Sequence, residues 1–342
     1  MNNYLIKNIK TLYGIDKEGN LRCRKGREMD EITSINDAYL IISDGKISSF
    51  GKMAELNMQE IAAEEYEIID ATDRFVLPAW CDSHTHLVYA NSREIEYIDK
   101  IKGLSYEEIA KRGGGILNSA QRLHETSEDQ LFEDALKRLH EMKQFGTGAV
   151  EIKSGYGLTT ESELKMLRVI KRLKQESDMT IKSTFLGAHS IPMEYRGCQD
   201  KYVDLIVNEM IPQVGEEKLA DYIDVFCDKG FFTVEDTERI LSAGREYGMR
   251  PKIHANELDY SGGIQVGVKY QALSVDHLEY TGKEEIEVLK NSDTIPTILP
   301  GAAFFLNMVY APARAMMEAG LPVALATDYN PGSSPSGNMQ LI

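Results

Sequence analysis

Short apolar runs alternate with longer segments of mixed polarity from Arg74 to the end of the chain. The runs are typical of buried strands, and the longer segments, with apolar residues three and four positions apart, are typical of helices. Because a predicted helix lies between each pair of consecutive strands, the strands can all pair in parallel. The predicted strands are Phe75–Cys81, Gly148–Ile152, Thr180–Leu186, Ile223–Phe226, Pro251–His254, Ala272–Asp276, Thr294–Leu299 and Val323–Ala326. Eight such units predict an α/β fold, a (β/α)8 barrel of the TIM type.

Residues 1–73 show a different pattern, in which apolar and polar residues alternate over short runs. The runs Asn3–Leu12, Asp37–Ile42 and Lys46–Gly51 predict strands, and turn residues at 43–45 separate the last two. We therefore expect a small β-sheet domain over residues 1–73, followed by the barrel over residues 74–342.

The composition narrows the classes of protein and partner. Of the 342 residues, 42% are apolar and 27% are charged, which is typical of a chain that folds around a large core. The 54 acidic and 38 basic residues give a net charge of −16, which disfavours nucleic acid and anionic membrane surfaces. No apolar run approaches the about 18 residues of a membrane span, and the four cysteines have no metal-binding or disulfide spacing. We expect no nucleic acid or membrane partner, and a cytoplasmic location.

The histidines are concentrated where a barrel builds its active site. Five of the seven lie at or just beyond the carboxyl end of a predicted strand, the rim at which barrel enzymes place their functional residues. These are His84, His86, His189, His254 and His277. Histidines buried for packing alone would not be distributed in this way.

Four of the rim residues form a metal-ligand set. His84 and His86 are two positions apart, so in extended backbone both imidazoles point the same way. His254 ends the fifth predicted strand and Asp328 follows the eighth. Three imidazoles and one carboxylate suit Zn2+ or Fe2+, with an open position for water in a catalytic site. Each residue alone also fits a turn or a cap, and their joint placement favours the metal site.

Two further rim residues suit acid–base chemistry. Glu257 lies three positions after His254, and His277 ends the sixth strand. A carboxylate or an imidazole close to an activated water can take up its proton and return it to a leaving nitrogen. The alternatives are a solvated loop acid for Glu257 and a hydrogen-bond donor to a metal ligand for His277. Asp82 is expected to orient a ligand.

These residues resemble the amidohydrolase superfamily and, within it, the imidazolonepropionase family. The resemblance rests on segments that follow one another in the same order: residues 82–86 (DSHTH), 113–116 (GGGI), 151–158 (EIKSGYGL), 187–189 (GAH), 254–257 (HANE) and 326–333 (ATDYNPGS). It implies the ring-opening hydrolysis of the cyclic amide 4-imidazolone-5-propanoate to N-formimidoyl-L-glutamate, a step of histidine degradation. It also implies one divalent metal ion, Zn2+ or Fe2+, a small-molecule substrate and a homodimer.

The resemblance assigns a role to each matching position. The metal ligands are His84, His86, His254 and Asp328; Glu257, His277 and Asp328 serve catalysis; and Arg93, Tyr156, His189, Asn330, Gly332 and Ser333, with Tyr106 as a weaker match, contact substrate or product. A guanidinium suits the propionate of such a substrate because its paired donors match the two carboxylate oxygens. The alternative for Arg93 is an ion pair at the surface with neighbouring acids, which contributes little.

The resemblance also sets an expectation about the end of the chain and leaves two other functions open. Members of the family continue past the position of Ile342 with segments that complete the small domain, so we expect a C-terminally truncated chain. One alternative function is that of another amidohydrolase, such as a nucleobase or aminohydrolase-type deaminase, which shares the metal ligands. The other is a barrel in which the metal is structural and has no water position.

Overall fold

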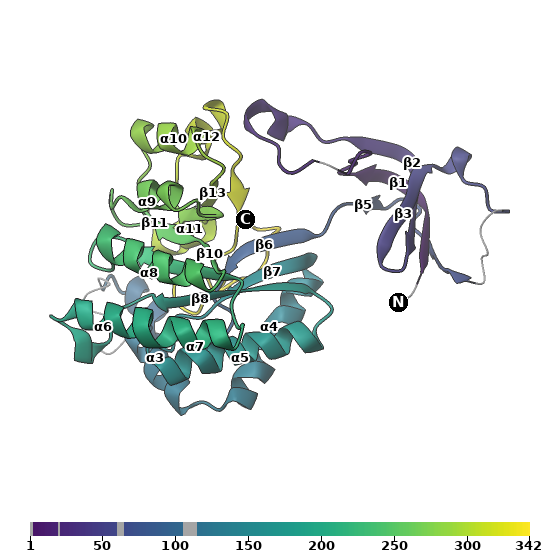
Figure 1. Ribbon diagram of the computed structural model, residues 1–342. Coiled ribbons are helices and arrows are strands. Elements are labelled where there is room, and N and C mark those ends of the chain that lie inside the picture. The colour runs from purple at the N-terminus through teal and green to yellow at the C-terminus, as the bar shows by residue number, and fades with distance from the viewer. Residues whose placement is uncertain (1–2, 20, 60–64, 105–114) are drawn as a thin grey trace. The chain divides into compact units, whose positions relative to one another are not determined.

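The computed structural model describes residues 3–19, 21–59, 65–104 and 115–342 (Figure 1). Contacts along the chain divide it into two compact units, Met1–Ala79 and Trp80–Ile342. No helix among the described residues combines the length and the apolar character that crossing a membrane requires.

The first unit is a five-stranded sheet, which confirms the small N-terminal sheet. Its strands are β1 (Tyr4–Tyr13), β2 (Ser34–Ser43), β3 (Lys46–Lys52), β4 (Glu67–Asp70) and β5 (Phe75–Val76). The order is β3-β2-β1-β4, with β5 paired to the far end of β1. The strands β1, β2 and β3 are antiparallel neighbours, whereas β4 and β5 run parallel to β1. One face buries a small apolar cluster that includes Ile9 and Leu40.

The second unit is a parallel barrel, as the alternation of strands and helices predicts. Its strands are β6 (Trp80–Thr85), β7 (Thr147–Lys153), β8 (Thr180–Ala188), β9 (Tyr222–Cys227), β10 (Arg250–Pro251), β11 (Ile253–Ala255), β12 (Ser274–His277), β13 (Ile295–Ile298) and β14 (Ala324–Leu325). Neighbouring strands in the sheet follow the order β14-β13-β12-β11-β9-β8-β7-β6. The short strand β10 precedes β11 in sequence, and both pair with β9, so β10 and β11 together occupy one of the eight strand positions.

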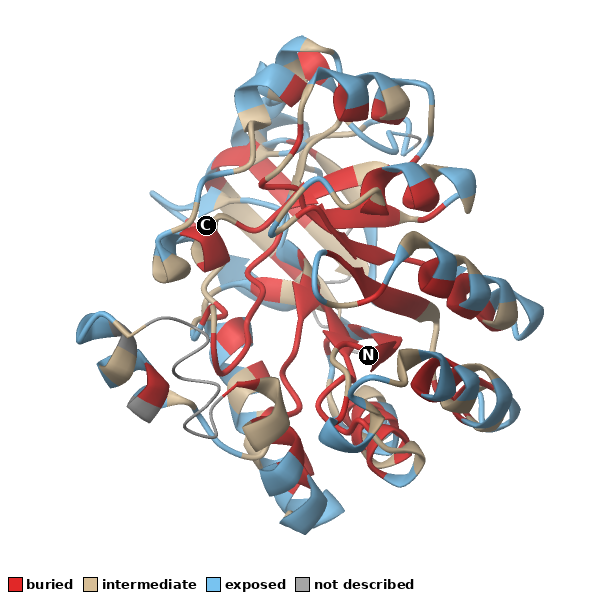
Figure 2. Cartoon of the chain, turned by 90° about the vertical axis from the view of Figure 1, so that its left-hand side faces the viewer, coloured by how far each residue is buried: buried red, intermediate tan, exposed pale blue. Residues whose placement is uncertain are grey.

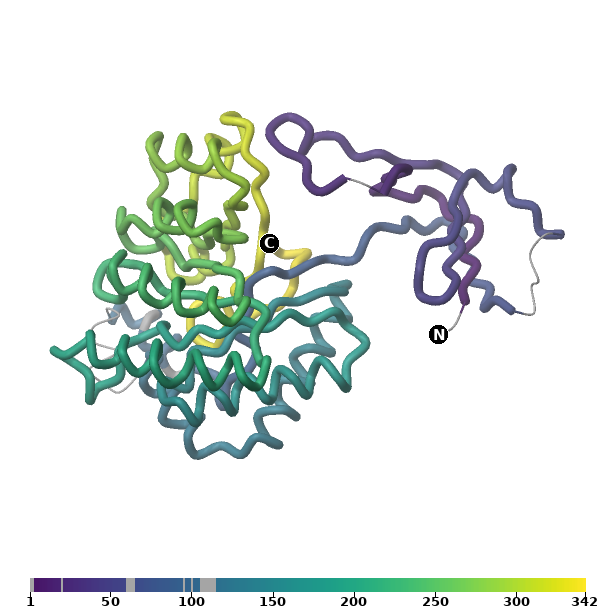
Figure 3. The backbone as a smooth tube through the Cα atoms, in the orientation of Figure 1, coloured from purple at the N-terminus to yellow at the C-terminus, as the bar shows by residue number. Residues whose placement is uncertain are grey.

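The segment that follows the last strand pairs with the first strand, so that the barrel is nearly closed. A parallel bridge joins Thr85 to Tyr329. The N–H of Asp328 donates to the carbonyl of His84 (3.0 Å), and the N–H of His86 donates to the carbonyl of Tyr329 (2.9 Å). Figure 3 shows the yellow C-terminal segment running beside the segment that carries β6. Residues 84–86 and Asp328, far apart in sequence, are thereby fixed beside one another.

Helices surround the strands. They are α1 (Glu94–Ile101), α3 (Ile116–Glu125), α4 (Glu128–Gln144), α5 (Thr160–Glu176), α6 (Gln199–Leu205), α7 (Ile211–Glu216), α8 (Val234–Glu246), α9 (Gly263–Lys269), α10 (Lys283–Lys290), α11 (Pro300–Leu306) and α12 (Ala313–Glu318). In α4, Ser127 caps the helix by accepting the N–H of Gln130, and Leu131, Ala135 and Leu139 recur every four residues on its buried face. Figure 2 shows the buried residues concentrated on the strands and on one side of each long helix.

Two boundaries differ from the sequence prediction. The run Phe75–Cys81 is not the first barrel strand: β5 pairs with β1 in the small sheet, and β6 begins at Trp80. Pro78 lies between them and has no N–H for a sheet ladder, so the apolar run is divided. Apolar residues three and four positions apart also predict a helix over Tyr106–His124. It is observed as α3 from Ile116, and residues 105–114 lie outside the described residues.

Candidate metal centre and substrate pocket

Four strand ends bring the predicted metal ligands together. His84 lies within β6 and His86 just beyond it, His254 lies in β11, and Asp328 follows β14. All four are at most 2% exposed. The Nε2 atoms of His84 and His86 lie 3.6 and 3.5 Å from Oδ1 of Asp328, and the Nε2 atoms of His86 and His254 are 3.4 Å apart.

These three separations match the spacing of ligands around one small cation, and His84, His86 and Asp328 offer ligand atoms that all lie within 4.8 Å of one another, whereas His254 is grouped with other histidines of the centre. Donor atoms that lie about 2.0–2.2 Å from a tetrahedral ion are about 3.3–3.6 Å from one another. The buried Nε2 of His84 has no hydrogen-bond partner among the described residues, which would be costly for a polar atom with no further role. The donor set therefore fits a divalent ion of the Zn2+ or Fe2+ type.

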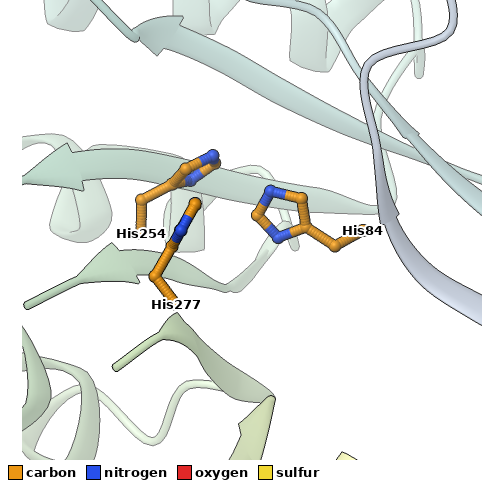
Figure 4. Close-up of side chains that lie close together, drawn as sticks. All are labelled: His84, His254 and His277. Carbon is orange, nitrogen blue, oxygen red and sulfur yellow. The ribbon is translucent and has the colours of Figure 1, made fainter. Parts of the chain in front are cut away.

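Two more imidazoles lie beside this set. His277 at the end of β12 shares a space with His84 and His254, and the potential ligand atoms of these three lie within 4.8 Å of one another. Figure 4 shows the three rings directed toward one another from separate strands. His189, after β8, forms a similar group with His86 and His254. The structure thus gathers all five rim histidines, and either of these two could approach an ion held by the other three.

Two buried aspartates that the sequence analysis did not single out lie behind the ligand histidines. Nδ1 of His84 lies 2.7 Å from Oδ2 of Asp276, and Nδ1 of His254 lies 3.0 Å from Oδ2 of Asp224. A carboxylate at Nδ1 fixes the proton there and leaves Nε2 free to bind a cation. Asp276 was predicted only as the end of a strand, although its position next to His277 could have indicated this role.

Buried lysines form ion pairs with these aspartates and compensate their negative charge. Nζ of Lys153 lies 2.8 Å from both Glu151 and Asp224, and Nζ of Lys252 lies 3.1 Å from Asp276. Burial favours the neutral amine, but Asp224 and Glu151 raise the pKa of Lys153, so that it remains a cation. His254 and Lys153 likewise hold the pKa of Asp224 well below its usual range against the effect of burial. Both charges of this pair are therefore retained in the barrel interior.

Four of the imidazoles at the centre favour the neutral form. Burial first, and then neighbouring cationic groups, lower the pKa values of His84, His86 and His277 well below the usual range, and lower the pKa of His189 to about 3. Neutral imidazole is the form that offers a lone pair to a metal. These histidines therefore need not lose a proton when a cation binds.

The pKa values of the carboxyl groups at the centre shift upward, because burial favours the neutral form of an acid as well. Burial raises the pKa of Asp328 to about 8. Burial and the nearby charge of Asp328 also raise the pKa of Glu279 to about 8. Burial, Glu279 and Asp328 raise the pKa of Glu257 well above its usual range. Oε2 of Glu257 lies 3.6 Å from Nδ1 of His277, and Oε2 of Glu279 lies 3.9 Å from the same atom. Glu279, which was not predicted, thus extends the acid–base group around His277.

The pKa of Asp328 makes metal affinity depend on pH. Below a pH of about 8 this carboxyl carries a proton that must leave before it can bind a cation, whereas His84 and His86 carry none. We expect the Kd for Zn2+ to fall about tenfold per pH unit between about pH 6 and pH 8, with one proton released per ion. Titration calorimetry in buffers of different ionisation enthalpy measures both quantities. A Kd that does not change over this range would contradict the assignment.

Residues at the metal centre have unusual backbone angles. The φ angles are 54° at Asn256, 83° at His277 and 54° at Asp328, all in the left-handed region. Non-glycine residues rarely adopt this region, and each such residue costs of order 1–3 kcal/mol. Side-chain contacts offset this strain: Asn256 donates to the carbonyl of Tyr280, for example. The surrounding contacts therefore hold the functional side chains in directions that the backbone alone would disfavour.

A pocket of about 670 Å³ opens above the metal centre. Its polar side includes His86, His254, His277, Glu257 and Asp328, and its apolar side includes Phe226, Phe231, Phe305, Leu306 and Met308. Of the residues predicted to contact substrate or product, the structure places these on the pocket wall: Arg93, Tyr156, His189, Asn330, Gly332 and Ser333. Tyr106 lies outside the described residues. A mostly apolar pocket with a few directed polar groups is typical of small-molecule sites.

Arg93 is held in the pocket wall. Its side chain is 9% exposed, and its Nε and Nη2 lie 2.9 and 2.7 Å from Oε2 of Glu96. A Cβ added to Gly332 would lie 2.2 Å from Nη1 of Arg93, so any larger residue here would displace the guanidinium from its present position. Arg93 is therefore an oriented cation in the pocket wall, and it forms the ion pair with a neighbouring acid that the alternative expects, although both side chains of the pair are only 9% exposed.

The turn after β14 is organised by Asn330. Its side-chain oxygen accepts the N–H groups of Gly332 and Ser333, each at 2.8 Å, and its amide donates to the carbonyl of Asp328 at 2.7 Å. The hydroxyl of Ser333 lies 3.3 Å from Oδ2 of Asp328. Asp82, which was expected to orient a ligand, accepts the N–H and hydroxyl of Thr327, the residue before Asp328. Both contacts fix the backbone on either side of the carboxylate ligand.

Comparisons with solved structures show the fold. A triazine hydrolase from Arthrobacter aurescens superimposes with a TM-score of 0.69 at 16% identity, over 99% of this chain and 74% of that one. A 5-methylcytosine deaminase from Klebsiella pneumoniae gives 0.69 at 17% identity, over 99% and 79%. An atrazine chlorohydrolase from Arthrobacter aurescens, complexed with zinc and atraton, gives 0.67 at 16% identity, over 98% and 74%. These are barrel proteins of the amidohydrolase superfamily.

Sequence comparisons are more specific. No protein-family model matches the chain. The imidazolonepropionase of Christiangramia forsetii is 55% identical over 338 residues, which are 99% of this chain and 81% of that protein. The imidazolonepropionase of Thermoanaerobacter pseudethanolicus is 47% identical over 339 residues, 99% of this chain and 79% of that protein. At these identities and coverages, the chain belongs to the imidazolonepropionase family of the amidohydrolase superfamily.

Proposed function

We propose that this chain hydrolyses the cyclic amide of 4-imidazolone-5-propanoate to N-formimidoyl-L-glutamate in histidine degradation. The relatives at 47–55% identity carry the name of this activity. The observation that carries the proposal is the group of His84, His86 and Asp328 at metal-ligand spacing, with His254 at 3.4 Å from His86, beside a pocket that His86, His254, Asp328 and Arg93 line. The test is incubation of the metal-loaded chain with the imidazolone, with mass spectrometry to detect N-formimidoyl-L-glutamate.

These four residues would hold one divalent ion, Zn2+ or Fe2+. When bound, such an ion lowers the pKa of water toward neutrality and polarises a carbonyl oxygen. Asp276 and Asp224 would keep the ligand rings of His84 and His254 in the tautomer that binds through Nε2.

The chain's own groups would move the protons of the reaction. Glu257 would take the proton of the water that attacks the ring carbonyl, since a raised pKa makes its carboxylate a stronger base. His277, beside Glu257, would donate a hydrogen bond to the carbonyl oxygen as negative charge develops there. Glu257 or Asp328 would then return the proton to the departing ring nitrogen, which breaks the C–N bond and opens the ring.

Arg93 would bind the propionate and so hold the ring carbonyl toward the metal ligands. Replacing it by methionine, which keeps much of the length without the charge, should raise KM for the imidazolone about tenfold to a hundredfold, because a charge-assisted contact is lost. Steady-state kinetics measure this, with Arg196→Met as the control at an exposed arginine away from the pocket. An unchanged KM in the Arg93 variant would assign the propionate to another group.

A deaminase is the second candidate function, since a 5-methylcytosine deaminase shares the barrel fold. Release of ammonia from a nucleobase, with no opening of the imidazolone, would favour it. The third candidate is a non-catalytic barrel with a structural metal ion. It predicts that protein atoms fill every coordination position of the ion and that neither substrate is turned over. Metal analysis and the two assays on the same preparation separate these three outcomes.

We further propose that the enzyme is a cytoplasmic homodimer. The absence of a disulfide among the described residues is compatible with a reducing compartment. Light scattering on the purified chain would give twice the mass of one chain if the dimer forms, and the mass of one chain if it does not.

A further inference from the structure

The turn that follows β7 is closed by a residue outside the proposed catalytic set. Glu163 lies in the first turn of α5 and is fully buried. Its Oε2 accepts the N–H of Gly155 at 3.0 Å, and its Oε1 accepts the N–H groups of Gly157 at 2.7 Å and Leu158 at 2.9 Å. One carboxylate therefore binds three of the backbone donors of this turn, none of which is part of a sheet or helix ladder.

The backbone of the turn depends on this contact. Gly155 has a φ of 110° and Leu158 a φ of 56°, so the chain passes through the left-handed region at both ends of the turn. A Cβ added to Gly157 would lie 2.4 Å from the backbone N of Glu163, which shows that the turn packs directly on the first turn of α5. Hydrogen bonds to Glu163 hold a backbone path that the leucine would otherwise disfavour.

Tyr156 lies at the centre of this turn, between the two glycines. It is 2% exposed and lines the substrate pocket. Its ring centroid lies 5.8 Å from that of His86 and 5.3 Å from that of His189. Because Tyr156 is flanked by residues whose N–H groups bind Glu163, any change in the turn moves its side chain.

The same turn also fixes His189. Nδ1 of His189 lies 3.0 Å from the carbonyl oxygen of Gly155, and the ring stacks on His86 with centroids 5.1 Å apart. A carbonyl oxygen can only accept, so Nδ1 carries the hydrogen and Nε2 of the neutral ring carries a lone pair. The carbonyl that orients His189 belongs to the same residue whose N–H binds Oε2 of Glu163.

We propose that Glu163 is a positioning residue for substrate binding, which sets the direction of Tyr156 and the tautomer of His189 through the turn at Gly155–Leu158. The pocket then presents Nε2 of His189 as an acceptor, which suits a ring N–H of the substrate and disfavours a ring oxygen at that place. This inference rests on the proposed function, because it concerns how the imidazolone is held.

The test compares Glu163→Gln with Glu161→Gln. Glutamine has the same size, but its NH2 cannot accept, so the variant keeps the two bonds at Oε1 and loses the bond to Gly155. We expect KM for the imidazolone to rise about tenfold, kcat to change less than about threefold, and the metal content to stay at that of the wild type. Glu161 is exposed in the same helical turn, so Glu161→Gln keeps the wild-type KM.

A double-mutant cycle separates positioning from a general loss of stability. In a Tyr156→Ala/His189→Gln background both side chains that Glu163 positions are absent, so adding Glu163→Gln should raise KM by no more than about twofold. If Glu163→Gln does not fold, Gly157→Ala replaces it, because the added Cβ forces the turn away from α5 and should raise KM in the same way.

The outcomes are distinct. An unchanged KM in folded Glu163→Gln, or in Gly157→Ala where that variant takes its place, overturns the inference. A tenfold rise that persists in full in the Tyr156→Ala/His189→Gln background does so as well. A wild-type chain that does not open the imidazolone ring overturns the proposed function and this inference with it, whereas a wild-type chain that does so leaves the variants to decide the inference alone.

Discussion

Replacing His254 by alanine is expected to abolish metal binding and turnover together. Nε2 of His254 lies 3.4 Å from Nε2 of His86, and its Nδ1 lies 3.0 Å from Oδ2 of Asp224. Loss of a residue that orients a metal ligand costs about tenfold to a hundredfold in affinity, and loss of the ligand itself should cost more. The variant should purify with less than one tenth of the wild-type metal, by atomic emission spectroscopy, and should show no detectable ring opening.

A control histidine distinguishes the site from a general effect of losing an imidazole. His140 is exposed on α4, so His140→Ala should keep both metal and activity. Full activity in a His254→Ala preparation that contains no metal would contradict the proposed mechanism. Metal loss alone, with turnover retained, would show that the ion stabilises the barrel and takes no part in the reaction.

Replacing Glu257 by glutamine is expected to lower kcat by about a hundredfold to ten-thousandfold while the metal stays bound. The amide has the same shape but cannot take a proton from water. Glu257 is not among the four proposed ligands, so the metal content should remain that of the wild type. Stopped assays with the imidazolone, run beside metal analysis, measure both quantities.

The same variant should be at least as stable as the wild type. Burial and the charges of Glu279 and Asp328 raise the pKa of Glu257, so a neutral amide removes part of this repulsion at any pH where the carboxyl groups ionise. Thermal unfolding of the metal-free chains tests this, with Asp259→Asn as the control because Asp259 forms an exposed pair with Lys229 nearby.

For the kinetic prediction, a kcat of Glu257→Gln equal to that of the wild type would assign the base to another residue.

The barrel could be predicted because its strands are short apolar runs separated by amphipathic helices. The first strand was misplaced because its residues are polar: Asp82, His84 and Thr85 point to partners on other strands, and polarity hides the strand in the sequence. The apolar run before it belongs to the small sheet instead. Where a strand carries the functional residues, its hydrophobic pattern is the weakest.

The positions of the site residues could be predicted in part. Strand ends converge in a parallel barrel, so His84, His254 and Asp328 could be expected to meet. Glu163 gave no signal, because an acidic residue in the first turn of a helix is common and its contacts are with the backbone of a turn. The pairing of Arg93 with Glu96 depends on α1, a helix that the sequence pattern did not indicate.

Anomalous diffraction from crystals of the zinc-loaded chain, measured at the zinc edge, tests the central claim most directly. The account predicts one strong peak, about 2.0–2.2 Å from the Nε2 atoms of His84, His86 and His254 and from a carboxylate oxygen of Asp328. A peak bound by other residues, or no peak among these four side chains at full zinc occupancy in solution, would contradict it.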